Sequence, residues 1–295
     1  MRILVTGTEG QVARAMAERA EAHGVTVTLL GRPDLDLAEP ARVVGAVCAL
    51  AADIVVNAAA YTAVDQAEAE PALAQTVNEA GAHAVASAAA KMGIPIVQLS
   101  TDYVFDGSGA HPYREDDPVE PLGVYGRTKL AGERAVAEAN PDHAILRTAW
   151  VYSPFGKNFV RTMLRVGQGR DEVAVVADQH GSPTSALDIA DGVITVCRNL
   201  LAQPKDLSLR GVFHMTGQGY TTWADFAEAI FDRAGRQGGP SPYVRRIATA
   251  EYLTPARRPA SSRLDCSRLA RVHGVALPAW RQSVEACVDR LLTHA

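Results

Sequence analysis

A regular alternation of short apolar segments with longer alanine-rich segments, over the first 150 residues, is the feature that most constrains the fold. Runs such as IVVN and IVQL are continuously apolar, which is typical of strands buried on both faces of a parallel sheet. The segments between them carry apolar residues at helical spacing. This order predicts a doubly wound α/β fold with a parallel sheet. The expected strands are 2–6, 25–30, 53–57, 94–99 and 143–147, and the expected helices are 11–23, 39–50, 71–92 and 124–139.

The alternation stops at about residue 150. Clusters of Gly, Pro and polar residues then separate shorter segments that no longer repeat the strand–helix unit. We therefore predict two parts. Residues 1–149, with a returning segment at about 184–216, form the sheet domain. Residues of about 150–183 and 217–295 form a smaller lobe at the carboxyl ends of the strands.

Composition excludes several classes of protein. A chain of 295 residues that is 47% apolar can bury a sizeable core. Its 29 basic and 33 acidic residues, without a long basic run, argue against a nucleic-acid partner. No apolar stretch approaches the roughly 20 residues of a membrane span, and none resembles a signal-peptide core. The four scattered cysteines form no metal or redox motif. We expect a cytoplasmic protein without a membrane partner.

The first strand leads into a glycine-rich turn, GTEGQVA. Gly7 permits a tight turn, Gly10 lets a pyrophosphate approach the backbone, and Ala13 keeps the helix close to the strand. The free N–H groups of the following helix attract phosphate. A carboxylate at the end of the second strand would favour NAD, but that strand ends in Leu-Leu-Gly-Arg, and Arg32 suits a 2′-phosphate. The sequence thus predicts a nicotinamide dinucleotide cofactor, with NADPH favoured over NADH.

A Y-x-x-x-K motif opens the helix expected at 124–139. The spacing places Tyr125 and Lys129 on one helix face, one turn apart. An ammonium group beside a phenol lowers the phenol pKa, so Tyr125 is expected to serve as an acid–base group in carbonyl reduction. Thr101 follows the fourth strand, at the sheet edge where such folds bind ligands, and can hydrogen-bond the same substrate oxygen.

Together these motifs resemble the extended short-chain dehydrogenase/reductase superfamily, which has a Rossmann fold. Within it, the chain is similar to the dTDP-4-dehydrorhamnose reductase family. The similarity rests on the glycine-rich turn and on the segments VVNAAAYTAVDQAE, STDYVFDG, VYGRTKLAGE, RTAWVY, DQHGSPT and YLTPARRPASSRLD. It extends in order over nearly the whole chain.

The resemblance implies NAD(P)H-dependent reduction of the 4-keto group of dTDP-4-dehydro-L-rhamnose, the last step of dTDP-rhamnose biosynthesis. Tyr125 would be the proton donor, Lys129 would hold the nicotinamide ribose, and Thr101 would polarise the keto oxygen. Other positions match cofactor contacts of the family: Gly10, Gln11, Val12, Asp36, Leu37, Ala60, Tyr61, Thr62 and Leu99. Positions that match contacts to the sugar nucleotide are Thr101, Asp102 and Trp150. Arg257 and Arg258 are candidate partners of the diphosphate because guanidinium geometry suits phosphate oxygens.

Several alternatives stay open from the sequence. A reductase of a related nucleotide sugar, such as dTDP-dehydrostreptose, would carry the same motifs. A non-catalytic, NADP-binding regulatory subunit would keep the fold, although Thr101, Tyr125 and Lys129 are all present. Some relatives bind a divalent metal through a carboxylate just inside the first helix, where this chain reads Arg-Ala-Met. No metal site is therefore predicted, and a Mg²⁺ requirement stays open. A homodimer agrees with the family, but the sequence does not fix the oligomeric state.

Overall fold

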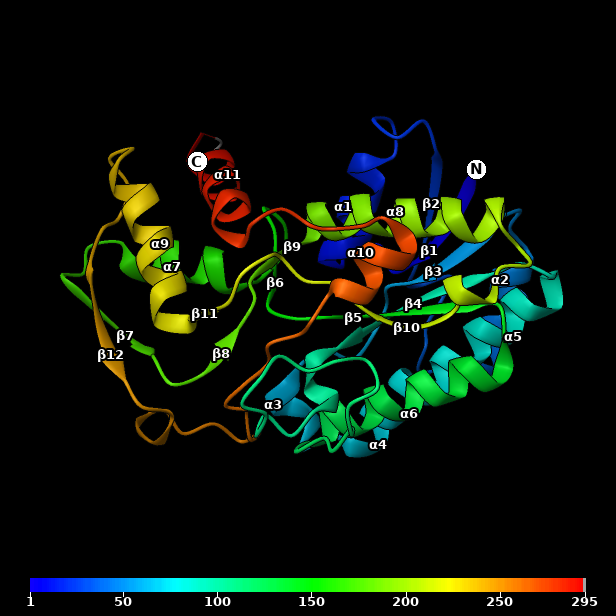
Figure 1. Ribbon diagram of the computed structural model, residues 1–295, viewed down its shortest axis with the longest axis horizontal. Coiled ribbons are helices and arrows are strands. Elements are labelled where there is room, and N and C mark those ends of the chain that lie inside the picture. Colours follow the sequence, from blue (N-terminus) through cyan, green and yellow to red (C-terminus); the bar gives the residue numbers. More distant parts are fainter. Residues whose placement is uncertain (294–295) are drawn as a thin grey trace.

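A six-stranded, all-parallel sheet forms the centre of the computed structural model, which describes residues 1–293 (Figure 1). The strand order is β10-β5-β4-β3-β1-β2, so the chain builds outward from β1 to one edge and then from β3 to the other. This confirms the doubly wound fold. The strands are β1 Arg2–Thr6, β2 Thr26–Leu30, β3 Ile54–Asn57, β4 Ile96–Thr101, β5 His143–Thr148 and β10 Gly211–His214.

Helices cover both faces of the sheet because its strands are apolar on both sides. Ile3 and Val5 of β1 pack in one hydrophobic cluster, whereas Leu4 between them packs in another. Helices α1 (Gln11–Arg19) and α8 (Ala186–Ala202) cover the first face. Helices α2 (Pro40–Cys48), α5 (Ala82–Met92) and α6 (Val124–Ala139) cover the second (Figure 1).

The helix expected at 71–92 has these bounds, but its middle turn is π-helical, which was not predicted. Helix α4 (Pro71–Gln75) passes into a π-helical turn, Thr76–Gly81, before α5 begins. Within that turn, the buried Asn78 side chain accepts a hydrogen bond from the Tyr61 backbone N–H and donates one to Thr128. A Cβ at Gly81 would lie 2.6 Å from the Leu37 carbonyl oxygen. These tertiary contacts fix the irregular turn, and helical periodicity does not report them.

A second body packs around its own hydrophobic cluster, beside the carboxyl ends of the strands (Figure 1). It contains α7 (Phe159–Gly167), α9 (Trp223–Gly235) and α11 (Trp280–Thr293). Strand β7 (Glu172–Val176) pairs with β12 (Tyr243–Ile247), and short strands β6 (Val151–Tyr152), β8 (His180–Gly181), β9 (Thr184–Ser185) and β11 (Thr221–Thr222) lie between the two bodies. Helices α3 (Val64–Ala67) and α10 (Ser267–His273) complete the fold.

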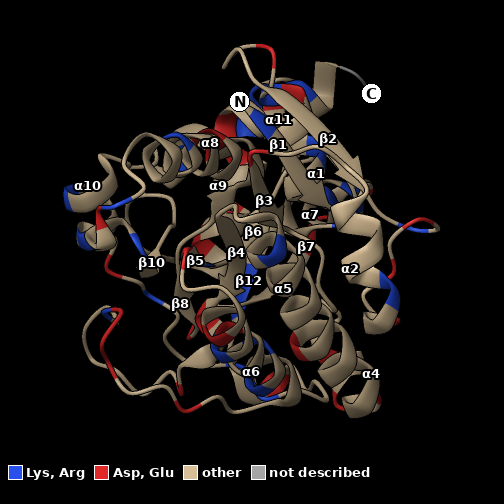
Figure 2. Ribbon diagram, turned by 90° about the vertical axis from the view of Figure 1, so that its right-hand side faces the viewer, with Lys and Arg blue, Asp and Glu red and all other residues tan. Residues whose placement is uncertain are grey.

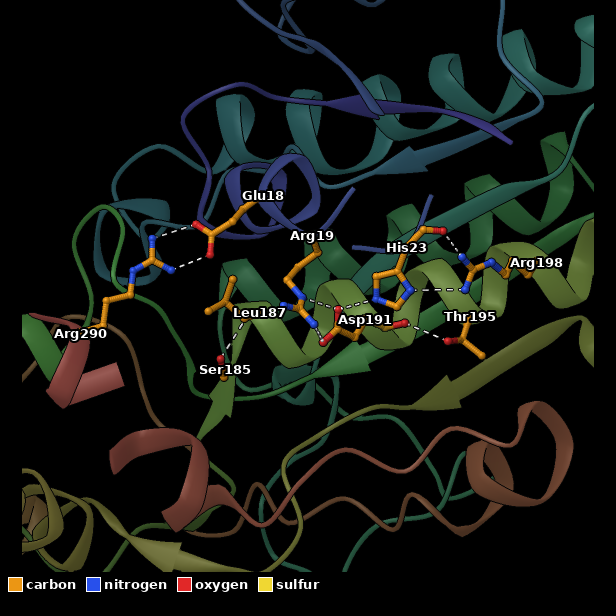
Figure 3. Close-up of polar contacts among 9 residues, drawn as sticks. All are labelled: Glu18, Arg19, His23, Ser185, Leu187, Asp191, Thr195, Arg198 and Arg290. Atoms are coloured by element: carbon orange, nitrogen blue, oxygen red, sulfur yellow. Dashed lines mark hydrogen bonds and ion pairs between the residues drawn. The ribbon is translucent and has the colours of Figure 1, made fainter. Parts of the chain in front are cut away.

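Polar contacts join the helices on the α1 face (Figure 3). Arg19 of α1 donates two hydrogen bonds to Asp191 of α8, at 2.6 and 2.9 Å, and His23 Nε2 lies 2.7 Å from the same carboxylate. Arg290 of α11 pairs with both oxygens of Glu18. The last helix of the chain is thereby tied to the first.

Charged residues are interspersed over the helices rather than gathered by sign (Figure 2). Within residues 1–293, no helix is long and apolar enough to cross a membrane.

Candidate functional site

The predicted catalytic residues converge where β4 meets α6. Thr101 is the last residue of β4, and Tyr125 and Lys129 lie one helical turn apart near the start of α6. Gly126 permits this packing, because a Cβ there would lie 2.1 Å from the Tyr103 carbonyl oxygen. Helix α6 can therefore approach the end of β4 closely enough to bring the Tyr125 hydroxyl near the Thr101 side chain.

Burial shifts the pKa values of Tyr125 and Lys129. The pKa of the Tyr125 phenol is raised well above its ordinary value by burial, with Asp102 and Tyr103 adding to the rise. The Lys129 Nζ donates to the Leu99 carbonyl oxygen at 2.7 Å, and burial lowers the Lys129 pKa to about 8. The expected lowering of the Tyr125 pKa by Lys129 is thus wrong for this arrangement, because desolvation dominates. Tyr125 is a neutral phenol at pH 7, which is the form that donates a proton.

Asp102 is a buried carboxyl group directly beside Thr101. The Thr101 Oγ1 donates to Asp102 Oδ1 at 2.9 Å, and the Ser262 hydroxyl lies near this side chain. The Asp102 Oδ2 has no partner within residues 1–293. Burial raises the Asp102 pKa to about 6, against the opposing effect of the two hydroxyl groups. A group of this kind can donate a hydrogen bond when it is protonated.

Glu133 and Arg147 form a buried ion pair near Lys129, which was not predicted from the sequence. Glu133 lies one further turn along α6 and accepts hydrogen bonds from Arg147 Nε and Nη2 at 2.9 and 2.7 Å. Ser100 Oγ donates to the same carboxylate at 2.5 Å. Glu133 also opposes the fall in the Lys129 pKa. The sequence does contain features that could have indicated this pair. Arg147 interrupts the apolar strand AILRT, and Glu133 lies on the same helix face as Tyr125 and Lys129.

The glycine-rich turn has the form that a pyrophosphate site requires. Gly7 has a φ of 92°, in the region that favours glycine, and a Cβ at Gly10 would meet no atom within 4 Å. No side chain caps α1, and no acidic residue occupies its first turn, so the N–H groups at Gln11 and Val12 remain available to an anion. These residues fit a dinucleotide phosphate.

The Gln11 side chain, in contrast, is bonded to the loop that follows β6. Its Oε1 accepts from Ser153 Oγ at 2.8 Å and from Asn158 Nδ2 at 3.0 Å, while its Nε2 donates to the Val151 carbonyl oxygen at 3.4 Å. The Gln11 side chain is therefore occupied by protein partners, and its backbone N–H is the group left open to an anion.

The remaining predicted cofactor positions flank this turn. Arg32 is exposed and lines a cavity of about 570 Å³ together with Asp36. The Leu37 side chain is buried in the core, so only its backbone can meet a ligand. Tyr61 packs against the same small apolar cluster as Tyr125, and its neighbours Ala60 and Thr62 follow the carboxyl end of β3. The structure thus places the β3 loop next to the catalytic helix.

A segment at 248–265 crosses the site from the second body. Ser262 from this segment lies near Asp102, as described above. Arg258 Nη2 lies 2.9 Å from Asp65 Oδ2, and the Ala256 N–H donates to the other oxygen of Asp65 at 3.2 Å. Arg258 is therefore engaged with α3, rather than free for a diphosphate as expected, whereas Arg257 is exposed.

Comparisons with known proteins agree with this geometry. A family described as "RmlD substrate binding domain" matches residues 1–293. A dTDP-4-dehydrorhamnose reductase of Sinorhizobium fredii is 50% identical over 292 residues, which cover 99% of this chain and 98% of the relative. The crystal structure of a dTDP-4-dehydrorhamnose reductase from Clostridium acetobutylicum superimposes with a TM-score of 0.89 at 38% identity, covering 99% and 100% of the two chains. That of a Bacillus anthracis dTDP-4-dehydrorhamnose reductase in complex with NADP gives 0.87 at 33% identity, covering 100% and 99%.

Proposed function

The chain belongs to the dTDP-4-dehydrorhamnose reductase family, and we propose that it reduces the 4-keto group of dTDP-4-dehydro-L-rhamnose to give dTDP-L-rhamnose. The observation that carries the proposal is the convergence of Thr101, Tyr125 and Lys129 at the carboxyl edge of the sheet, beside an open glycine-rich turn. Ligands of doubly wound folds bind at this edge.

Each residue has a defined part in the reaction. A bound reduced nicotinamide supplies a hydride to the carbonyl carbon. Tyr125 donates its phenolic proton to the carbonyl oxygen. The Thr101 hydroxyl hydrogen-bonds the same oxygen once its single proton turns away from Asp102, to which it donates in this structure. Lys129, anchored on Leu99 O, retains further N–H groups for the ribose hydroxyls.

NADPH is the proposed cofactor. The end of β2 carries no carboxylate for the ribose hydroxyls, and a Cβ at Gly31 would lie only 3.0 Å from the Thr8 backbone nitrogen. The adjacent Arg32 is exposed, and its guanidinium can pair with a 2′-phosphate. Arg32→Ala is expected to weaken NADPH binding by roughly tenfold while NADH binding changes little. Equal losses for both cofactors would contradict this role.

The direct test is oxidation of NADPH and NADH by the purified protein with dTDP-4-dehydro-L-rhamnose. A parallel reaction with dTDP-dehydrostreptose tests the alternative sugar. Rapid turnover of the first sugar, with dTDP-L-rhamnose as product, supports the proposal. Turnover of the second sugar alone would reassign the substrate. Failure with both sugars, despite NADPH binding, would favour a regulatory subunit.

A further inference from the structure

The helix that carries Tyr125 and Lys129 is capped by a residue from a distant part of the chain. Helices α7, α8 and α9 each begin with a local cap, provided by the side chains of Asn158, Ser185 and Thr222. Helix α6 instead begins after Gly123, which has no side chain for this purpose. The Glu68 Oε1 takes that place and accepts a hydrogen bond from the Val124 N–H at 2.7 Å. The cap therefore comes from a residue 56 positions earlier in the chain.

Glycine at position 123 leaves the room that this carboxylate needs. A Cβ at Gly123 would lie 2.7 Å from Glu68 Oε1, and beyond its chain neighbours it would meet no other residue of the described chain within 4 Å. The backbone at Gly123 is extended, with φ −124° and ψ 174°, a conformation that residues with side chains adopt at this position of a helix. Glycine is thus required for space rather than for conformation, and Glu68 fills that space.

The support for Glu68 also packs against the first turn of α6. Glu68 directly follows α3, whose last residue, Ala67, is fully buried. Ala67 shares a small apolar cluster with Val124, and the Tyr125 ring packs against the same cluster. A hydrogen bond and an apolar contact from one short segment therefore hold the helical turn that carries Tyr125.

Helix α3 is itself held on its other side. Asp65, in its first turn, accepts from the Ala256 N–H and pairs with Arg258, as described above. The four-residue helix thus lies between the segment at 248–265 and α6. A support fixed in this way holds a functional group more precisely than a free loop would. The half-buried Glu68 carboxylate also complements the positive end of the α6 dipole.

We propose that Glu68 is a positioning residue, whose cap on the first turn of α6 fixes where Tyr125 presents its hydroxyl to the substrate carbonyl. The inference rests on the proposed function, because it concerns proton donation by Tyr125. Glu68 acts through the backbone of Val124, the neighbour of Tyr125, and this role requires no contact with the substrate. Since proton transfer depends steeply on the geometry of donor and acceptor, a small shift of this turn slows the chemical step while binding persists.

The test compares the wild type with four variants. Glu68→Ala removes the cap, whereas Glu68→Gln keeps an oxygen that can accept from the Val124 N–H. Glu68→Ala combined with Gly123→Ser supplies a local cap in the space that the carboxylate leaves. The control is Ser185→Ala, which removes the bond from the Leu187 N–H that caps α8, on the opposite face of the sheet (Figure 3).

Two measurements accompany kcat and KM with dTDP-4-dehydro-L-rhamnose. The solvent deuterium isotope effect on kcat reports how far proton donation limits the reaction, which a loss of folded protein does not change. Amide hydrogen exchange of residues 124–127 reports the cap directly and needs no substrate.

We expect Glu68→Ala to lower kcat by roughly tenfold while KM stays within about twofold of the wild-type value. Its solvent isotope effect should rise, because proton donation slows relative to the other steps, and exchange in the first turn of α6 should accelerate. Glu68→Gln and the double variant should recover most of kcat, since each restores an acceptor. Ser185→Ala should keep the wild-type kcat and isotope effect.

A wild-type kcat in Glu68→Ala would overturn the inference. A lower kcat with an unchanged isotope effect would also overturn it, because the role would then be structural only. So would a double variant that regains slow exchange but not kcat, since Glu68 would then act other than as a cap. Lack of turnover by the wild type would instead refute the proposed function, while the exchange measurement would still report the cap.

Discussion

Replacing Glu133 by Gln should destabilise the protein more than any conservative change at its surface. The Glu133 and Arg147 side chains are only 5% and 4% exposed, and the substitution leaves the arginine charge buried without a counter-charge. Arg147 Nη1 already lacks a hydrogen-bond partner within residues 1–293. Breaking a buried pair in this way costs about 3–5 kcal/mol of unfolding free energy. For a chain of 295 residues this corresponds to a fall in melting temperature on the order of 5–8 °C.

Urea unfolding followed by circular dichroism measures this loss. The matched control is Glu39→Gln, because the Glu39–Arg42 pair is exposed to solvent and should contribute no more than about 0.5 kcal/mol. Arg147→Met combined with Glu133→Gln removes both charges and should recover most of the stability. A loss below about 1 kcal/mol in Glu133→Gln alone would refute the reasoning, since it would mean that water or another group compensates the arginine.

Three further predictions follow from the site. Tyr125→Phe should lower kcat by about 10²- to 10⁴-fold in the NADPH-oxidation assay and leave the Kd of NADPH unchanged, because only the proton donor is lost; near-normal turnover would exclude the role. The Asp102 pKa is raised from 3.8 to about 6, so the folded protein keeps a proton that the unfolded chain loses between these values. Its unfolding free energy, relative to Asp102→Asn, should therefore fall by about 2 kcal/mol as pH rises from about 4 to 6; a pH-independent difference in urea titrations would contradict this. Gly126→Ala should lower kcat and the unfolding free energy, because the added methyl group forces α6 away from the Tyr103 carbonyl oxygen. The control Gly45→Ala in α2, whose added methyl group meets no atom within 4 Å, should raise the unfolding free energy by about 0.5–1 kcal/mol. Equal effects of the two substitutions in urea unfolding would count against the Gly126 contact.

Elements that are encoded locally could be predicted from the sequence. The strand expected at 2–6 and the helix expected at 124–139 have the predicted bounds, because each carries its own apolar pattern. The strand expected at 94–99 lies at Ile96–Thr101, since a continuous apolar run does not mark its own ends. The helix expected at 71–92 also has its predicted bounds, but its π-helical turn depends on contacts of Asn78 and Gly81 with segments distant along the chain, which no local pattern reveals.

The same distinction applies to the site. Tyr125 and Lys129 were found because their spacing is local. The partners that define their chemistry come from other elements: Leu99 bonds Lys129, and Arg147 pairs with Glu133. The direction of the Tyr125 pKa was mispredicted because burial depends on the packed structure. The stacking of Trp223 on Trp150 could not be predicted, because it joins residues 73 positions apart.

During synthesis, the last strand of the central sheet leaves the ribosome late. Strand β10 and helix α8, which cover the edge of β5 and the apolar face beside α1, emerge only after the segment that carries β6, α7 and β7. Until then, a nascent chain exposes an unpaired strand edge and an uncovered hydrophobic face, the two features that promote aggregation. Helix α11, whose Arg290 pairs with Glu18, emerges last of all. We therefore expect the central sheet to be completed only after most of the chain has been synthesised.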